Sequence, residues 1–200
     1  ISTHDGEEAI AGQVHQRLKP RHADILTVIV PRHPERAEEI ASVLAQTGLN
    51  VVRRTSGAPI EPDTDVFLGD TIGEMGLYLR LTEIAFVGRS LTWEGGQNPL
   101  EPAMLETAVL AGRNVQNFRD SYQKLLESGG AKLVRDEEML AGAVNYLLGN
   151  DAVRRAMMRA GAQTVEEMRG ALARTTEALE PFIHPLVVKS RLHGGNGTDG

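Results

Sequence analysis

The stretch that decides the fold is Asp24-Ile25-Leu26-Thr27-Val28-Ile29-Val30, which is stopped by Pro31. It is short, apolar and rich in β-branched side chains, and it does not alternate with polar residues. Such a run is typical of a strand that is buried on both faces, as the strands of parallel sheets are. Similar short runs follow along the chain at residues 49–53, 65–69, 84–88, 108–111 and 131–134.

Helical patterns separate these runs. Residues 34–46 place apolar side chains three and four positions apart, and residues 75–81, 100–106 and 118–126 do so over shorter lengths. Strands that alternate with helices indicate right-handed crossovers between parallel strands. We therefore predict an α/β fold, with one parallel sheet and helices on both of its faces.

The last third of the chain changes to a purely helical pattern. Residues from about 136 to 180 predict two or three consecutive helices, with breaks at Asn150 and Gly170. Pro181 predicts the end of ordered structure. Residues 181–200 are therefore expected to form a flexible tail, since they have almost nothing to bury.

The composition describes one soluble domain. The chain has 200 residues, no cysteine, and 21 Lys and Arg against 27 Asp and Glu, for a net charge of −6. This balance argues against a nucleic-acid partner, and the missing cysteines exclude disulfides and thiolate zinc sites. The chain contains no run of about 18 apolar residues, the length that could span a membrane. The chain begins with Ile1 rather than Met, as a domain cut from a longer protein would.

In open α/β sheets, ligands bind beyond the carboxyl ends of the strands, where loops lead into helices. Four such junctions carry more polar residues and glycines than a connection needs. The first is Pro31-Arg32-His33-Pro34. Arg32 stands where a guanidinium could bind an anion bidentately. The alternative is that His33 and Glu35 only cap the helix and that Arg32 is solvated.

The second junction is Asp70-Thr71-Ile72-Gly73-Glu74. Thr71 and Glu74 have the spacing of a capping box, which predicts a helix start. Gly73 would also let backbone N–H groups approach an anion closely, which favours a phosphate site.

The third junction is the most informative and runs from Trp93 to Pro102. Asn98 suits the N-cap of a helix and Pro99 its first position, but capping does not explain the pair Gly95-Gly96 before them. A carboxylate at Glu101 would oppose a phosphate unless it accepts hydrogen bonds from sugar hydroxyls. Phosphate on backbone amides and ribose on a carboxylate is the combination that nucleotide binding requires.

The fourth junction, Thr3-His4-Asp5-Gly6, is expected to cap a helix that runs to about Leu18, through Thr3 or Asp5. The dinucleotide-binding, P-loop, zinc-protease and nucleophile-elbow motifs are all absent. Their absence disfavours the corresponding enzyme classes.

Six motifs, in this order, resemble the carboxyl-terminal half of 3-deoxy-D-manno-octulosonic acid (Kdo) transferases. They cover residues 2 to about 120 and are Ser2-Thr3-His4-x-Gly6-Glu7-Glu8, Val30-Pro31-Arg32-His33-Pro34-Glu35-Arg36, Asp70-Thr71-Ile72-Gly73-Glu74-Met75-Gly76-Leu77, Ala85-Phe86-Val87-Gly88-x-Ser90-Leu91, Gly95-Gly96-Gln97-Asn98-Pro99-Leu100-Glu101-Pro102-Ala103 and Asn117-Phe118-Arg119.

The resemblance implies a GT-B glycosyltransferase, in which two Rossmann-like domains face each other across a cleft. Residues 1–180 would form its donor-nucleotide-binding domain, with C-terminal helices. The family's acceptor domain carries the catalytic base and would be absent from this chain, so the chain would hold no catalytic residue and would be inactive alone. The family transfers Kdo from CMP-Kdo to the lipid A precursor during lipopolysaccharide synthesis in Gram-negative bacteria. The implied reaction inverts the anomeric carbon and needs neither a metal nor a cofactor.

The resemblance also implies which residues contact CMP and where the parent protein lies in the cell. Carried over by motif, the CMP contacts would be Pro31, Arg32, Ile72, Gly73, Glu74, Asn98, Pro99, Leu100 and Glu101. Arg32 would hold the phosphate and Glu101 would orient the ribose. The lipid A precursor would bind through the missing domain. The parent protein would lie at the cytoplasmic face of the inner membrane, whereas this fragment alone would be soluble.

Some positions depart from the family's commonest pattern. Gln97 stands where many members have His, Arg89 stands where many have Gly, and residues 113–116 replace a Gly-Pro-His-Thr-like stretch. Two alternatives stay open. One is a GT-B glycosyltransferase or epimerase that uses a UDP-sugar, and the other is a non-catalytic nucleotide-binding module.

Overall fold

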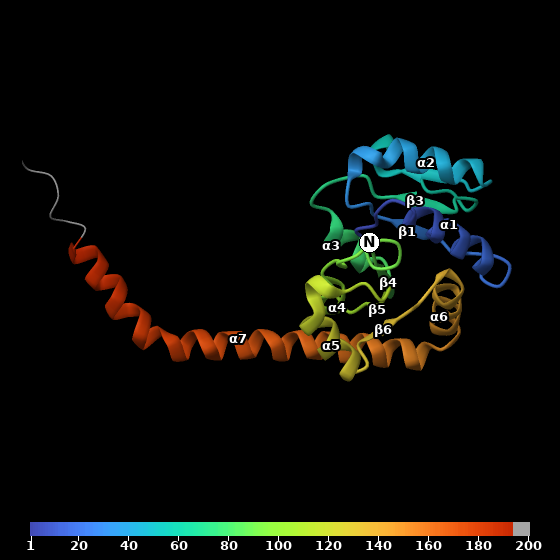
Figure 1. The fold of residues 1–200 in the computed structure, drawn as a ribbon. Coiled ribbons are helices and arrows are strands. Elements are labelled where there is room, and N and C mark those ends of the chain that lie inside the picture. Colours follow the sequence, from blue (N-terminus) through green and yellow to red (C-terminus); the bar gives the residue numbers. More distant parts are fainter. Residues whose placement is uncertain (194–200) are drawn as a thin grey trace, which may run out of the picture. The chain divides into compact units, whose positions relative to one another are not determined.

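The computed structural model describes the backbone of residues 1–193 and the side chains of residues 1–171 and of Leu179. The chain divides into two compact units, residues 1–164 and residues 165–200. The first unit contains alternating strands and helices (Figure 1). The last helix, α7 (Asp151–His193), begins in the first unit and continues into the second.

Each predicted apolar run contains a short strand. The strands are β1 (Thr27–Ile29), β2 (Val51–Arg53), β3 (Val66–Leu68), β4 (Ile84–Val87), β5 (Ala108–Ala111) and β6 (Ala131–Leu133). All of their pairings are parallel, as predicted. Except for β5, the strands are shorter than the apolar runs, because residues at the ends of the runs do not join the ladders.

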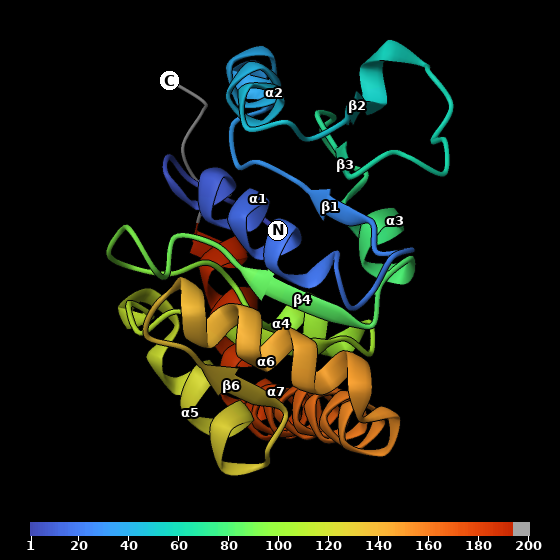
Figure 2. The same cartoon turned by 90° about the vertical axis from the view of Figure 1, so that its right-hand side faces the viewer.

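The strands form two sheets rather than the single sheet that we predicted. Their orders are β1-β3-β2 and β4-β5-β6. Residues 1–3 lie between the two sheets, and Figure 2 shows the amino terminus between β1 and β4. Thr3 forms one parallel bridge with Pro31, and the main chain of Ile1 exchanges hydrogen bonds with residues 86 and 88 on the other side. Residues 1–3 make only this isolated bridge on one side and two hydrogen bonds on the other, rather than a ladder, so the sheets stay separate.

The helices begin and end close to the predicted positions. They are α1 (Glu7–Leu18), α2 (Ala37–Gln46), α3 (Met75–Arg80), α4 (Leu100–Met104), α5 (Arg119–Glu127) and α6 (Glu137–Gly149), with short 3-10 turns before α2 and α5. The side chain of Asp136 caps α6 by accepting a hydrogen bond from the Met139 N–H group at 2.8 Å.

Two predictions about helix ends are wrong. No side chain caps α1, which is preceded instead by Gly6 with φ of 87°. The C-terminal helical region does break after Gly149, where α6 ends, as predicted. However, α7 does not break at Gly170 or Pro181 and continues to His193. A helical glycine costs only about 1 kcal/mol relative to alanine, which is too little to end a long helix; nothing in the structure explains how Pro181 is accommodated. The remainder of the predicted tail, residues 194–200, lies outside the described residues.

Helices cover both faces of the strands in the first unit. Val66 and Leu68 of β3 pack with residues of α2 and with Ala11 of α1. Phe67 points to the opposite face, where its ring lies edge to face with that of Tyr78 of α3, with 6.3 Å between the ring centroids. In the second sheet, Ala108 and Leu110 join a core with residues of α1, α6 and α7, and α4 and α5 contact β5 and β6. This is the layered arrangement that we predicted.

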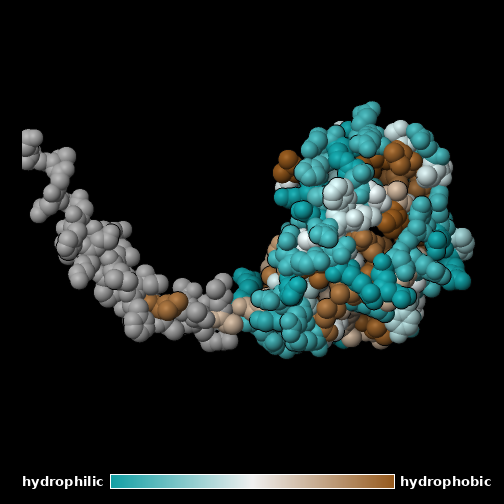
Figure 3. Space-filling view, in the orientation of Figure 1, coloured by the Kyte–Doolittle hydropathy of each residue, from teal (hydrophilic) through white to brown (hydrophobic). Residues whose placement is uncertain are grey.

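The visible surface of the first unit is mostly hydrophilic, with apolar side chains in separate patches (Figure 3). No helix in the described part of the chain combines the length and the apolar character that crossing a membrane requires.

Candidate functional site

The nine residues predicted to contact a nucleotide lie in three loops that follow β1, β3 and β4, except that Leu100 and Glu101 already belong to the first turn of α4. Because the paired strands are parallel, the carboxyl ends of β1 and β3 meet at one edge of their sheet. The end of β4 is brought to the same edge by residues 1–3, whose main chain is hydrogen-bonded to residues 30–32 on one side and to residues 86–88 on the other. The three loops therefore share one edge, which we call the donor edge.

The loop after β1 presents a free cation. The backbone N–H group of Arg32 donates to the Thr3 carbonyl oxygen at 3.0 Å, which fixes the start of the side chain. The Arg32 side chain is exposed and forms no ion pair with any residue whose side chain the structure describes. His33, by contrast, pairs with Glu35 at 3.3 Å and caps no helix. The structure thus leaves Arg32 available to an anion.

The loop after β3 does not form the predicted capping box. The Thr71 hydroxyl bonds to the Glu74 carboxylate rather than to a backbone N–H group, and α3 begins only at Met75. Tyr78 and Arg54 donate to the same carboxylate. Together with the Thr71 bond, which has the largest effect, they hold the pKa of Glu74 below its usual value.

The other two predicted residues of this loop are open to a ligand. Ile72 is 89% exposed. Gly73 has φ of 86°, and no atom lies within 4 Å of the position of a Cβ. Its left-handed conformation is the reason why the loop turns before the helix instead of entering it at Thr71.

The loop before α4 confirms the predicted cap. The Asn98 side-chain oxygen accepts a hydrogen bond from the Leu100 N–H group at 2.9 Å, and Pro99 already has helical angles. Pro99 is buried, Leu100 is half-buried and Glu101 is exposed. The carboxylate of Glu101 is therefore accessible at the start of this helix.

Gly95 and Gly96 both bend the chain and approach other segments closely. Their φ angles are 110° and 71°. A Cβ on Gly95 would lie 2.6 Å from the side-chain nitrogen (Nδ2) of Asn117, and one on Gly96 would lie 2.8 Å from the backbone carbonyl oxygen of Asn114. The loop can follow this path only with glycine at both positions.

Sequence reasoning missed the residue that organises these loops, which is Glu7. Its side chain is buried, and its two oxygens accept hydrogen bonds from four backbone N–H groups: His4 (3.0 Å), Arg89 (2.7 Å), Ser90 (2.9 Å) and Leu91 (3.1 Å). One carboxylate therefore joins the amino-terminal loop to the loop after β4. Acidic residues are common in the first turn of a helix, so the position of Glu7 alone does not indicate this role.

His4 lies between the loop after β1, which carries Arg32, and the loop after β4, which carries Arg89. Its ring is 5.7 Å from that of His33, and its Nε2 is 3.1 Å from the side-chain nitrogen of Gln97. Burial lowers the pKa of His4, and the nearby positive charges of Arg89, His33 and Arg32 lower it further, although Glu7 opposes them. Burial is the largest of these effects, so His4 favours its neutral form.

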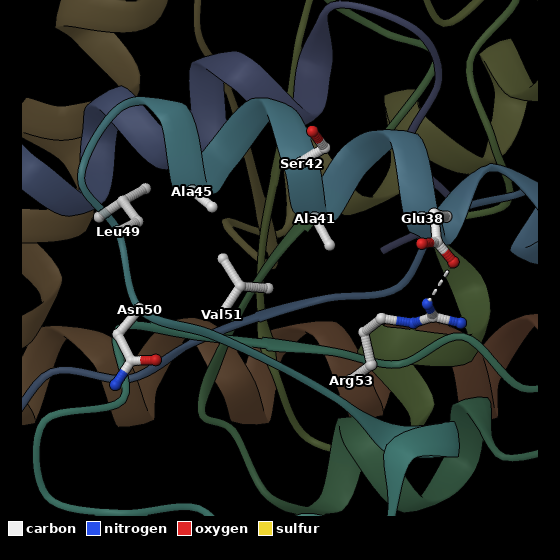
Figure 4. Close-up of a pocket in the computed structure, with 8 residues that line it drawn as sticks. All are labelled: Glu38, Ala41, Ser42, Ala45, Leu49, Asn50, Val51 and Arg53. Carbon is white, nitrogen blue, oxygen red and sulfur yellow. Dashed lines mark hydrogen bonds and ion pairs between the residues drawn. The ribbon is translucent and has the colours of Figure 1, made fainter.

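A pocket of about 450 Å³ lies between α2 and β2 (Figure 4). Its cation, Arg53, is already bonded to Glu38 and Asp70, at 3.0 Å each. The pocket therefore offers no free positive charge to a nucleotide. Among the residues that the structure describes, no group of three or more His, Asp or Glu side chains is placed to hold a metal ion.

The chain is similar to known transferases. It is 36% identical over 183 residues to the 3-deoxy-D-manno-octulosonic acid transferase of Haemophilus influenzae and 35% identical over 189 residues to that of Bordetella pertussis. Both alignments cover 91% of this chain but only 43% and 44% of the relatives. The chain thus spans less than half the length of these relatives. No protein-family model matches it.

Solved structures share its fold. The C-terminal CMP-Kdo binding domain of WaaA from Acinetobacter baumannii has a TM-score of 0.78 and 26% identity, over 82% of this chain and 86% of that one. The C-terminal domain of a glycosyl transferase group 1 family protein (LpcC) from Francisella tularensis has a TM-score of 0.56 and 16% identity, over 80% and 77%. In sequence and fold the chain corresponds to the carboxyl-terminal, GT-B-type domain of 3-deoxy-D-manno-octulosonic acid transferases.

Proposed function

We propose that the chain binds CMP-Kdo at the donor edge and is the donor half of a glycosyltransferase that transfers Kdo to the lipid A precursor. One observation carries this proposal. In a chain that corresponds to a domain of Kdo transferases, three loops at one edge bring together an unpaired arginine, an accessible carboxylate and backbone held by glycines. These are the groups that a phosphate and a ribose require.

Each predicted contact has a role in this proposal. Arg32, next to Pro31, binds the phosphate of CMP. Ile72 and Gly73 contact the nucleotide through apolar surface and backbone, and Glu74 keeps Arg54 and Tyr78 in place beside them. The segment Asn98-Pro99-Leu100-Glu101 presents the Glu101 carboxylate to the ribose hydroxyls.

The reaction follows from where charge develops. An acceptor hydroxyl attacks the anomeric carbon with inversion, and negative charge grows on the departing phosphate of CMP. A guanidinium such as that of Arg32 stabilises this charge without a metal. The general base and the acceptor site belong to the remaining part of the transferase, so these 200 residues alone would not transfer Kdo. That parent protein would act at the cytoplasmic face of the inner membrane.

Isothermal titration of the chain with CMP and with UMP tests the proposal. We expect a clear preference for CMP. Arg32→Ala should weaken CMP binding about 10- to 100-fold, because a hydrogen-bonded charge pair contributes about 1.5–3 kcal/mol. Arg21→Ala is the control, since Arg21 follows α1 on the side where β1 begins. A preference for UMP would favour the UDP-sugar alternative, and unchanged CMP affinity in Arg32→Ala would remove Arg32 from the phosphate site.

A further inference from the structure

A second unpaired guanidinium lies at the donor edge and has no part in the function proposed above. Arg89 is the second residue after β4, and its Nε donates to the Glu94 carbonyl oxygen at 3.0 Å. Neither terminal nitrogen of this guanidinium bonds to any residue described in the structure, and Arg89 forms no ion pair there. The side chain is half-buried, so its orientation is restricted while its terminal nitrogens stay unused.

The backbone of Arg89 is strained and firmly held. Its φ angle is 54°, in the left-handed region that favours glycine. Glu7 accepts a hydrogen bond from the Arg89 N–H group at 2.7 Å, and the Arg89 carbonyl oxygen accepts one from Gly96 at 2.8 Å. An arginine that stays at a position suited to glycine is a candidate for a function that needs its side chain.

Arg89 and Arg32 stand on opposite sides of the same short segment. The main chain of Thr3 bonds to that of Arg32, and the main chain of Ile1 bonds to that of Gly88, the residue before Arg89. Neighbouring strands are about 4.8 Å apart, so these two flanking backbones are roughly 10 Å apart. His4 lies between them, and both positive charges act on it. Long side chains from the two positions can therefore converge on neighbouring anionic groups.

The proposed donor carries two such groups. In a nucleotide-linked 2-keto sugar acid, the anomeric carbon bears both the phosphate ester and the carboxylate, so the two anions are adjacent. Arg32 accounts for one of them. We propose that Arg89 binds the carboxylate of the sugar acid and so selects an acidic sugar donor. This inference rests on the proposed binding of CMP-Kdo and names the part of that ligand that Arg89 recognises.

The test compares two probes that differ in the carboxylate. Cytidine 5′-(methyl phosphate) has one negative charge, and freshly prepared CMP-Kdo has two. Dissociation constants for both probes are measured by NMR titration of the wild-type chain, Arg89→Gly, Arg89→Lys and Arg113→Ala. Glycine accepts the backbone conformation at residue 89, so Arg89→Gly should fold at least as stably as the wild type. Arg113→Ala is the matched control because it removes one exposed positive charge from the loop after β5.

We expect Arg89→Gly to weaken CMP-Kdo binding about 10-fold or more and to change methyl phosphate binding less than about twofold. Arg89→Lys should restore part of the difference, because it keeps the charge but not the bidentate geometry. Equal weakening of both probes, or the same effect in Arg113→Ala, would overturn the role of Arg89. If the wild-type chain bound neither probe, the proposed function itself would fail, and this inference with it.

Discussion

Replacing Glu7 with glutamine tests whether one buried carboxylate holds the donor edge together. Glu7 is 2% exposed, and its oxygens accept hydrogen bonds from four backbone N–H groups. Three of these groups belong to residues 89–91, directly after β4, and the fourth belongs to His4. Glutamine has nearly the same shape as glutamate. The substitution therefore removes the charge and one acceptor without opening a cavity.

The expected loss of stability follows from these hydrogen bonds. The glutamine oxygen can accept from one pair of N–H groups, but its NH₂ group then faces the other pair, donor against donor. Each buried N–H group left without an acceptor costs about 1–3 kcal/mol, so two of them predict a loss of about 4 kcal/mol. Domains are typically stable by only about 5–15 kcal/mol. Glu7→Gln should therefore remove a large part of the free energy of unfolding.

Urea unfolding followed by circular dichroism measures that free energy. A second readout comes from Trp93, the single tryptophan of the chain, whose indole N–H group donates to the Asp5 carbonyl oxygen at 2.9 Å. Trp93 lies in the loop that Glu7 anchors. Its emission should shift to longer wavelength in the folded variant, because loosening of the loop would expose the indole beyond the 50% that is exposed now.

Glu8→Gln is the matched control. Glu8 is also buried, but burial raises the pKa of its carboxyl group, so a neutral side chain is better tolerated there. Its partner Arg36 keeps an ion pair with Asp5 at 3.1 Å. We expect this variant to lose less than about 1.5 kcal/mol, as most single substitutions without a buried orphan group do. A loss below about 1 kcal/mol for Glu7→Gln, or an equal loss for both variants, would refute the proposed role of Glu7.

Three further substitutions probe other parts of the first unit. Gly112→Ala would place a Cβ 1.9 Å from the Ser90 carbonyl oxygen, so the backbone must move; we expect a loss of about 3 kcal/mol, measured by thermal melting. Burial lowers the pKa of His15 from 6.5, despite the nearby Asp65, so the folded state resists protonation. The wild type should therefore lose stability as pH falls below about 6.5, and His15→Gln should lose less, as urea midpoints at pH 7.5 and pH 5 would show. Asp136→Ala removes the cap of α6 and should lower the free energy of unfolding by about 1 kcal/mol, measured by thermal melting. Asp136→Asn should retain most of that stability, because its side-chain oxygen can still accept the hydrogen bond.

The strands could be predicted because burial on both faces leaves a direct mark on composition. All four residues of β5, Ala108–Ala111, have no exposed surface, and Val66 and Leu68 of β3 have none either. Strands in such positions need continuous apolar side chains, so a short apolar run was a sufficient signal. The same reasoning located the loops at the carboxyl ends of the strands; the nine contact residues came from the family resemblance and stay a prediction.

The division into two sheets could not be predicted, because it depends on pairings that are distant in sequence. Residues 1–3 are too short and too mixed in polarity to indicate a strand. Their partners lie about 30 and 85 positions further along the chain. No local pattern reports such contacts, whereas a helix or a long strand leaves a periodic signal.

The prediction of a capping box at Thr71 was wrong for a related reason. The spacing Thr-x-x-Glu is satisfied by a side-chain bond between the two residues as well as by two bonds to backbone N–H groups. Tyr78 and Arg54 supply additional donors to Glu74 in the folded chain, and these favour the first arrangement. A motif that explains two residues by themselves cannot show which distant side chains compete for them.

These differences change which groups supply positive potential at the donor edge. The sequence directed attention to the amino termini of helices, but α3 has six residues and α4 has five. Such short helices align few peptide dipoles, so their ends attract an anion less strongly than those of longer helices do. Two guanidinium groups, at Arg32 and Arg89, carry full charges and are unpaired with the side chains that the structure describes. Anion binding at this edge should therefore depend on these two arginines more than on the helix starts, and on Glu7 for the position of Arg89.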